Sequence, residues 1–186
     1  MIHVIDCNNS NDWSEFIRDD TDAGAIPLKV RIEAPYPAPS NHPLYWVPND
    51  KGSTIEVDID QATGILYKFV AISSRHYNLG VECVSKLTVP EIQGIPICDV
   101  QRWPNKYQHE LKEDVQTAFG AGDGLLAIRF VGAGAPVLQY ASGDVRFGVD
   151  DKGRLAVVQA HNVPEERIAL FKRVVMRYAN NDAGKS

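Results

Sequence analysis

Residues 54–72 read TIEVDIDQATGILYKFVAI, and residues 144–160 read DVRFGVDDKGRLAVVQA. Each stretch contains an alternating strand, an aspartate, a short polar turn that ends in glycine, and a second strand. The aspartate side chain can order the turn, and the glycine supplies the positive φ that closes a hairpin. Both stretches therefore predict β-hairpins. The sequence is compatible with a duplication and with two independent solutions to the same turn.

Two further segments predict strands. Residues 26–33 alternate between apolar and polar side chains, which is typical of a half-buried strand. Residues 125–131 are mostly apolar and predict a buried strand, and the glycine-rich residues 132–136 predict the turn that follows it.

Three segments predict helices. Residues 12–20 begin with Asp12, which can cap the first backbone N–H groups, and their apolar residues share one face. Residues 104–119 begin with a proline and end before a glycine. The third helix opens at Pro164, because apolar residues recur at helical spacing from there, and residues 180–186 are expected to fray.

Residues 34–48 predict an ordered loop. They contain five prolines, which disfavour a regular helix or an interior strand. They also carry Tyr36, Tyr45 and Trp46, and a free linker rarely carries so many aromatic residues. We therefore expect this loop to pack on the domain.

These elements together predict one α+β domain spanning residues 1–186. Its composition, 44% hydrophobic and 23% charged, is ordinary for a globular protein of this length. The sheet should be largely antiparallel and built from hairpins, with two to three helices that include an amphipathic one at the C-terminus.

The composition argues against several classes of protein. The net charge of −5 disfavours a nucleic-acid binder, which normally carries a basic face. No apolar run suffices to span a membrane and the N-terminus does not resemble a signal peptide, so we expect a cytoplasmic location. Cys7, Cys83 and Cys98 are odd in number and show no C-x-x-C spacing, which indicates reduced thiols rather than disulfides or a zinc site.

One row of carboxylates is a candidate for binding. Glu56, Asp58 and Asp60 alternate along one predicted strand, so their side chains project from the same face. Such a row is most often a solvated outer face, and an acidic recognition surface is the main alternative. A cation site is a third alternative, but the turn lacks the ligand and the glycine of an EF-hand loop, so we predict no metal.

The sequence predicts no catalytic residues and no cofactor. The glycine-rich residues 120–124 follow a predicted helix and precede a strand, the reverse of a dinucleotide-binding loop. The five histidines lack metal-ligand spacing, and no nucleophile elbow is present. The alternative is a ligand-binding domain or small hydrolase whose site is assembled from distant residues such as Cys98, His109 and His76. An obligate homo-oligomer with a structural role is a third possibility.

Five aromatic residues lie in or beside predicted loops, namely Tyr36, Tyr45, Trp46, Tyr77 and Trp103. Exposed tyrosine and tryptophan side chains are common anchors of protein interfaces. The alternative is that each of them covers one end of the core. With Glu56, Asp58 and Asp60, these aromatic residues form the candidate partner-binding set.

The two hairpins resemble a segment that recurs in small bacterial immunity proteins, the antidotes of polymorphic and contact-dependent toxins. The resemblance rests on residues 55–66 and on residues 145–155, followed by Asn162-Val-Pro-Glu-Glu166 and a terminal helix. It implies a cytoplasmic, non-enzymatic protein that binds one toxin domain, such as a nuclease, and blocks its active site or substrate surface. These families share no catalytic residues, so the resemblance assigns no functional residue here.

Overall fold

The structure of the chain is a computed structural model. The described residues are 1–8, 14–16, 28–32, 44–48, 54–73, 85–103 and 109–173.

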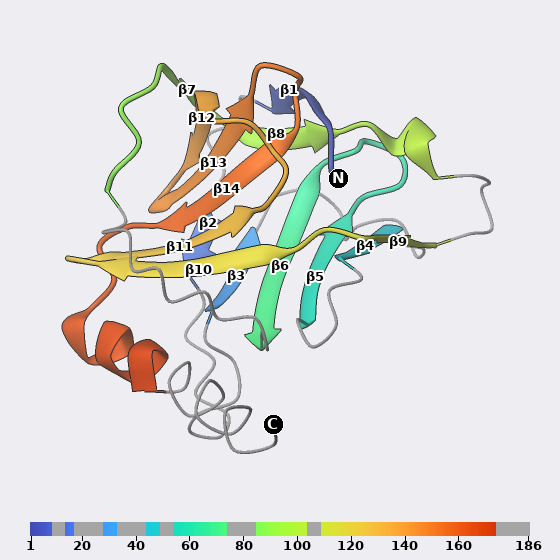
Figure 1. Cartoon of the computed structure of the whole chain (residues 1–186). Coiled ribbons are helices and arrows are strands. Elements are labelled where there is room, and N and C mark those ends of the chain that lie inside the picture. The colour runs from blue at the N-terminus through green and yellow to red at the C-terminus, as the bar shows by residue number, and fades with distance from the viewer. Residues whose placement is uncertain are drawn as a thin grey trace.

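Two six-stranded sheets make up most of the described fold (Figure 1). The first sheet contains, in spatial order, β2 (Ser14–Phe16), β3 (Leu28–Ile32), β6 (Leu66–Ser73), β5 (Thr54–Ile59), β4 (Leu44–Pro48) and β9 (Glu110–Glu113). The second sheet contains β10 (Thr117–Gly122), β11 (Leu125–Phe130), β14 (Leu155–Ala160), β13 (Val145–Asp150), β12 (Pro136–Ser142) and β7 (Glu91–Gln93).

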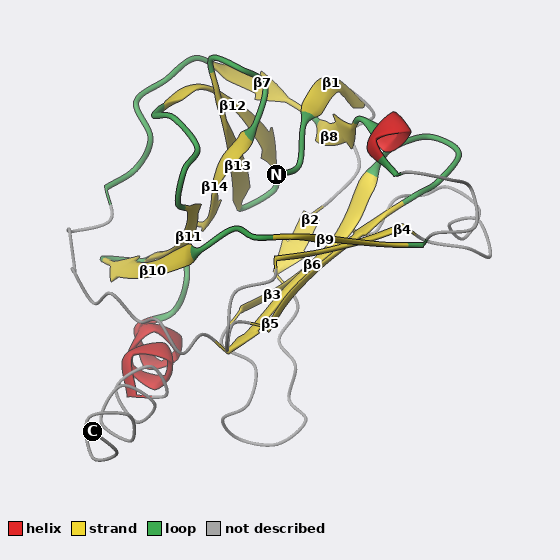
Figure 2. Cartoon of the chain, turned by 45° about the vertical axis from the view of Figure 1, so that its right-hand side comes forward, coloured by secondary structure: helices red, strands yellow, loops and turns green. Residues whose placement is uncertain are grey.

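The remaining described elements are short. Strand β1 (Val4–Asn8) pairs antiparallel with β8 (Ile95–Cys98), and a 3₁₀ turn, η1 (Val100–Arg102), follows β8. An α-helix occupies residues 165–173 after Pro164. Figure 2 shows β1 and β8 above the first sheet and beside β7 of the second, and this helix below β10.

Five consecutive strands have the same arrangement in both sheets. We call β2–β6 the first unit and β10–β14 the second unit. Within each unit all neighbours are antiparallel, and the third strand of each unit takes a sixth, parallel strand on its outer edge. That sixth strand is β9 in the first sheet and β7 in the second, and both come from the segment that links the units.

The two units also share their register. The pairing of β5 with β6 shifts between Asp58 and Ile59, and that of β13 with β14 shifts between Gly148 and Val149. Aligning these two irregularities places equal residues at several strand positions, namely Phe16 with Phe119, Leu28 with Leu126, Arg31 with Arg129, Leu44 with Leu138, Leu66 with Leu155 and Ala71 with Ala160. This agreement favours duplication over two independent solutions.

The two hairpin turns are built in the same way. Asp60 Oδ1 accepts the backbone N–H groups of Ala62 and Thr63, at 3.0 and 2.8 Å. Asp150 Oδ1 accepts those of Lys152 and Arg154, both at 2.9 Å. These contacts confirm that an aspartate orders each predicted turn.

A glycine closes each turn because another strand approaches it. Gly64 has a φ of +76°, and a Cβ at this position would lie 2.6 Å from the carbonyl oxygen of Cys98. The N–H of Cys98 donates to Gly64 at 2.7 Å, and the N–H of Val4 donates to Gly153 at 2.8 Å. Val4 and Cys98 are themselves paired, so β1 and β8 link the two turns.

One hydrophobic cluster contains the inward-facing residues of both sheets. Phe130 of the second sheet packs edge-on against Trp46 of the first, with ring centroids 5.5 Å apart, and lies 6.3 Å from Phe69. Trp46 is only 1% exposed. At the lower edge, Phe171 of the helix lies 6.0 Å from Phe119 of β10.

Several sequence predictions are confirmed. The structure contains both hairpins, strands within residues 26–33 and 125–131, and a helix that starts directly after Pro164. The sheets are largely antiparallel, as predicted. Residues 180–186 lie outside the described residues.

Two predicted helices are wrong where the structure describes them. Residues 14–16 form β2, and the segment 104–119 contains β9 and the start of β10. A helix of this length gains little stability by itself, so pairing with a neighbouring strand overrides a favourable cap. The 165–173 helix is the one α-helix among the described residues.

The predicted loop over residues 34–48 is wrong at its end, because Leu44–Pro48 forms β4. The prolines that suggested a loop lie mainly before this strand, and Pro48 is its last residue. Residues 34–43 lie outside the described residues.

Candidate functional site

The two sheets differ most on their outer faces, which are the faces turned away from the hydrophobic cluster. The outer face of the first sheet carries Tyr45, Glu56, Asp58, Lys68 and Glu110. None of these residues belongs to the cluster, whereas their strand neighbours Trp46, Val57 and Phe69 do.

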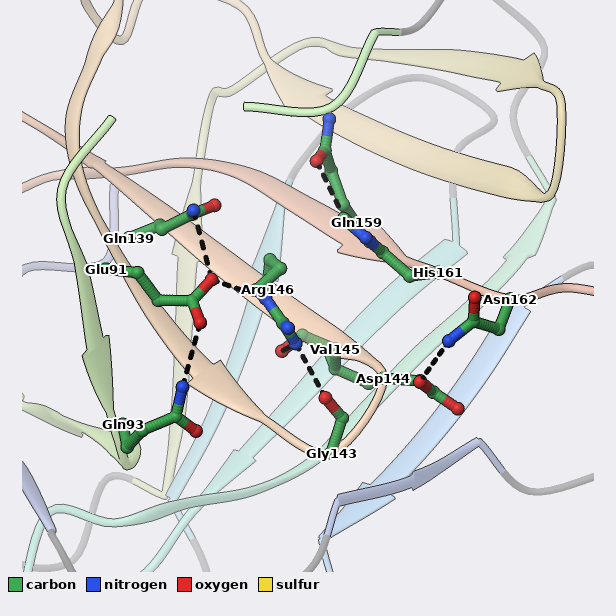
Figure 3. A network of polar contacts seen from close by, with 10 residues as sticks. All are labelled: Glu91, Gln93, Gln139, Gly143, Asp144, Val145, Arg146, Gln159, His161 and Asn162. Carbon is green, nitrogen blue, oxygen red and sulfur yellow. Dashed lines mark hydrogen bonds and ion pairs between the residues drawn. The ribbon is translucent and has the colours of Figure 1, made fainter. Parts of the chain in front are cut away.

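The outer face of the second sheet carries a polar network centred on Glu91 (Figure 3). The carboxylate of Glu91 accepts hydrogen bonds from Gln93 at 2.8 Å, from Gln139 at 3.1 Å and from Arg146 Nε at 2.8 Å. Arg146 also donates to the backbone carbonyl of Gly143 at 2.6 Å. The ion pair is therefore fixed by neutral partners on both sides.

A second group of contacts continues the network toward the end of β14. Gln159 is buried and lies 3.2 Å from His161, and Asn162 donates to Asp144 at 2.7 Å (Figure 3). Burial and then the positive charge of Arg146 lower the pKa of His161. His161 is therefore neutral near pH 7.

The segment 85–90 covers this outer face. The carbonyl oxygen of Ser85 accepts from Gln159 at 3.0 Å, and that of Pro90 accepts from the N–H of Gln139 at 2.9 Å. Between them Leu87 lies against Gly148, where a Cβ would approach Leu87 Cδ1 to 2.9 Å. The buried members of the network, Gln139 and Gln159, thus lie against residues 85–90, whereas Glu91, Gln93, Asp144 and Asn162 remain exposed.

On the first sheet, one lysine bridges two carboxylates. Lys68 Nζ lies 2.6 Å from Glu56 Oε1 and 3.0 Å from Asp58 Oδ2. Burial raises the pKa of Asp58 to about 6, although the hydrogen bond from Lys68 acts in the opposite direction. Burial acts to raise the pKa of Glu56 as well, but its hydrogen bonds to Lys68 and Asp58 hold it below the ordinary value.

Two tyrosines border these charged residues. Tyr45 is the direct cross-strand neighbour of Asp58, and Tyr67 lies at the irregularity of β6. Burial, followed by the charge of Asp58, raises the pKa of Tyr67. Both tyrosines are half-buried.

Matched positions in the two units show how different the faces are. Tyr45 corresponds to Gln139 and Lys68 to Val157, and in both pairs the first-unit residue is half-buried while its counterpart is buried. Tyr67 likewise matches the buried Ala156. At these three matched positions the outer face of the first sheet is therefore the more accessible of the two.

The structure brings together only part of the predicted carboxylate row. Glu56 and Asp58 meet at Lys68, but Asp60 turns into the hairpin loop. The expectation of a solvated row is wrong for Asp58 and Asp60, which are 4% and 9% exposed. A buried carboxylate needs donors, and here Lys68 and the turn supply them.

The predicted aromatic anchors are dispersed. Trp46 is buried and its indole N–H donates to Glu113 at 2.5 Å, and Trp103 is also buried. Tyr45 remains half-buried beside the charged face. Tyr36 and Tyr77 lie outside the described residues.

Sequence reasoning missed Lys68, Tyr67 and Glu110 as members of the face. Lys68 could have been found, because the hairpin register places it opposite Asp58. Glu110 could not, because it lies far away in sequence and was assigned to a helix.

The described residues do not support the predicted thiol–histidine alternative. Cys98 is fully buried, and burial raises the pKa of its thiol to about 12, the opposite of an activated nucleophile. His76 lies outside the described residues. In the part of the chain that the structure describes, no three histidine, cysteine or carboxylate side chains are grouped as metal ligands.

Comparison with known proteins assigns no family. No protein-family model matches the chain, and no curated protein sequence matches it. Within the described residues, no helix has the length and apolar character needed to span a membrane.

Proposed function

We propose that this protein is a non-enzymatic binding protein whose partner docks on the outer face of the first sheet. The observation that carries this proposal is the divergence between matched positions. Tyr45, Tyr67 and Lys68 are accessible where the second unit has buried Gln139, Ala156 and Val157.

The chemistry of this face suits a protein partner. Tyrosine supplies rigid contact area with a polar tip, and charged residues at the rim select orientation and raise the association rate. On β9, Glu110 and Lys112 are exposed and lie 3.4 Å apart. Adjacent Glu56 and Lys68 continue the alternation of charges across the sheet.

We infer further that the partner is a bacterial toxin domain and that the chain is its immunity protein. The resemblance of the two hairpins to those antidotes supports this class. The net charge of −5 supports a basic partner, such as a nuclease whose substrate is a polyanion.

The first test is co-expression of the tagged chain with the products of its neighbouring genes. A partner that co-purifies at a fixed ratio, that arrests growth when expressed alone, and that loses this toxicity beside the chain would establish the proposed function. A chain that protects against no neighbouring product would contradict it.

A charge reversal then locates the interface. Glu110→Lys should lower the association rate about tenfold at low salt, with a smaller effect at high salt, because a basic partner would meet a cation at the rim. Asp123→Lys is the matched control, since Asp123 is exposed in the β10–β11 turn of the second sheet. Stopped-flow kinetics at two salt concentrations should separate the variants; equal rates for both would place the interface elsewhere.

A further inference from the structure

The pair Glu56–Asp58 combines features that a simple surface ion pair lacks. Asp58 is 4% exposed, and its Oδ1 atom accepts no hydrogen bond from the residues that the structure describes. Its other oxygen shares the ammonium group of Lys68 with Glu56. An ionised carboxylate with a buried, unpaired oxygen is costly, and the cost disappears when that oxygen carries a proton.

Glu56 is the neighbouring group that can accept a hydrogen bond from a protonated Asp58. The two carboxyl groups share the ammonium group of Lys68, at 2.6 Å from Glu56 and 3.0 Å from Asp58. Two ionised carboxylates so close together repel each other, and one proton held between them removes this repulsion. Glu56 is the more exposed of the two, with a side chain that is 36% accessible, so it holds the negative charge more easily. Asp58 is then the protonated member.

We propose that Glu56 and Asp58 hold one proton between them, and that its loss switches the outer face of the first sheet between two charge states. With the proton on Asp58, the Glu56, Asp58 and Lys68 group is neutral. When the proton leaves to solvent, the group carries one negative charge in a largely buried position. Burial of Asp58 raises its pKa to about 6, which brings this change close to physiological pH.

Other titratable groups around Asp58 do not supply the missing donor in the folded structure. On the neighbouring strands these groups are Tyr45 of β4, Tyr67 of β6 and Asp60 at the end of β5. On β3, Arg31 is the backbone partner of Lys68. The second unit has no equivalent pair, because Gly148 and Arg146 stand where the first has Asp58 and Glu56.

The consequence for a partner rests on the proposed function, whereas the shared proton does not. A basic partner on this face would bind more tightly as pH rises through the titration of the pair. The experiment below uses the free protein alone, so it can fail or succeed independently of any partner.

The test is a pH titration of carboxyl ¹³C chemical shifts in the full chain between pH 4 and pH 8. We expect Asp58 to titrate near pH 6 and Glu56 at clearly lower pH. In Glu56→Gln the midpoint of Asp58 should fall by about one pH unit, because a negative neighbour is lost and an amide N–H can replace the shared proton. In Lys68→Met the midpoint should rise, because a positive neighbour is lost.

Glu110→Gln is the control, since Glu110 lies on the same face and forms an ion pair with Lys112 of its own strand. It should leave the Asp58 midpoint unchanged. Titration of Asp58 at the ordinary pH of an aspartate, or an unchanged midpoint in Glu56→Gln, would overturn the proposal. Amide spectra of each variant confirm that it is folded. The titration of the wild-type protein alone decides whether the pKa of Asp58 is raised, without any substitution.

Discussion

In the β5–β6 hairpin the first unit carries Asp58 opposite Lys68, and at the matched position of the β13–β14 hairpin the second unit carries Gly148 opposite Val157. Leu87 fills the space beside Gly148, whereas Asp58 holds an ion pair in the corresponding place. The residues that pack in the hydrophobic cluster differ less, since Leu44 matches Leu138 and Leu66 matches Leu155. Residues that build the common core are thus retained, and residues on the outer faces have diverged.

The turns offer the strongest test of this comparison, because the same aspartate has different partners in each. Asp150 accepts from the N–H groups of Gly134, Lys152 and Arg154 and from the Arg154 guanidinium. These bonds outweigh burial and hold the pKa of Asp150 well below its ordinary value. The Asp60 carboxylate accepts from its own turn, at Ala62 and Thr63.

Asp150→Ala should therefore lower the free energy of unfolding by roughly 3 kcal/mol or more, and Asp60→Ala by about 1 to 2 kcal/mol. Urea unfolding at pH 7 measures both. Because the folded pKa of Asp150 is depressed, its contribution is complete above the unfolded value of about 4 and is lost as pH falls below it. The difference in free energy of unfolding between wild type and Asp150→Ala should therefore shrink in acid. Equal losses of stability in Asp150→Ala and Asp60→Ala would show that the two turns are energetically equivalent.

Asp58→Asn tests the divergent outer face. The folded pKa of Asp58 is raised, so wild type loses stability as pH rises from about 4 to about 6. The neutral variant escapes this loss and should be more stable than wild type by roughly 2 to 3 kcal/mol at pH 8, with little difference at pH 4. Thermal unfolding across this range measures the effect. A difference independent of pH would mean that Asp58 is ionised throughout.

The hairpins were predictable because their information is local. An alternating strand, an aspartate and a glycine specify the turn, and the structure confirms both cases in residues 54–73 and 144–160. The helix that starts after Pro164 was predictable for the same reason, because the spacing of its apolar residues is also a local pattern. In contrast, β2, β9 and β10 have sequences with helical features, and strand pairing overrides these features. Strand β9 pairs with β4, which is distant in sequence, whereas β2 and β10 pair with β3 and β11, the next strands of their units.

The candidate face was predictable only in part, for the same reason. Alternation along β5 correctly placed Glu56 and Asp58 on one side, but burial of Asp58 depends on its surroundings in the folded chain. Tyr45 was assigned to a loop, although it is the cross-strand neighbour of Asp58. Glu110 joins the face through a parallel pairing of β9 with β4, which no local pattern indicates.

Gly148→Ala addresses the covering segment 85–90 and has the smallest expected effect. The added methyl would lie 2.6 Å from Val157 Cγ1 and 2.9 Å from Leu87 Cδ1. Leu87 can move more easily than a residue within β14, so we expect a cost of about 1 to 2 kcal/mol, taken mainly by displacement of the covering segment. Hydrogen exchange of residues 85–90 should accelerate.

Gly124→Ala is the matched control for that exchange measurement. Gly124 has a φ of +66°, so alanine is strained there, but nothing lies within 4 Å of the added methyl. Its cost should be similar, about 1 kcal/mol, while exchange of residues 85–90 stays at the wild-type rate. Faster exchange in both variants would mean that the segment responds to global stability. Faster exchange in Gly148→Ala alone would show that the contact of Leu87 with Gly148 holds residues 85–90 against the second outer face.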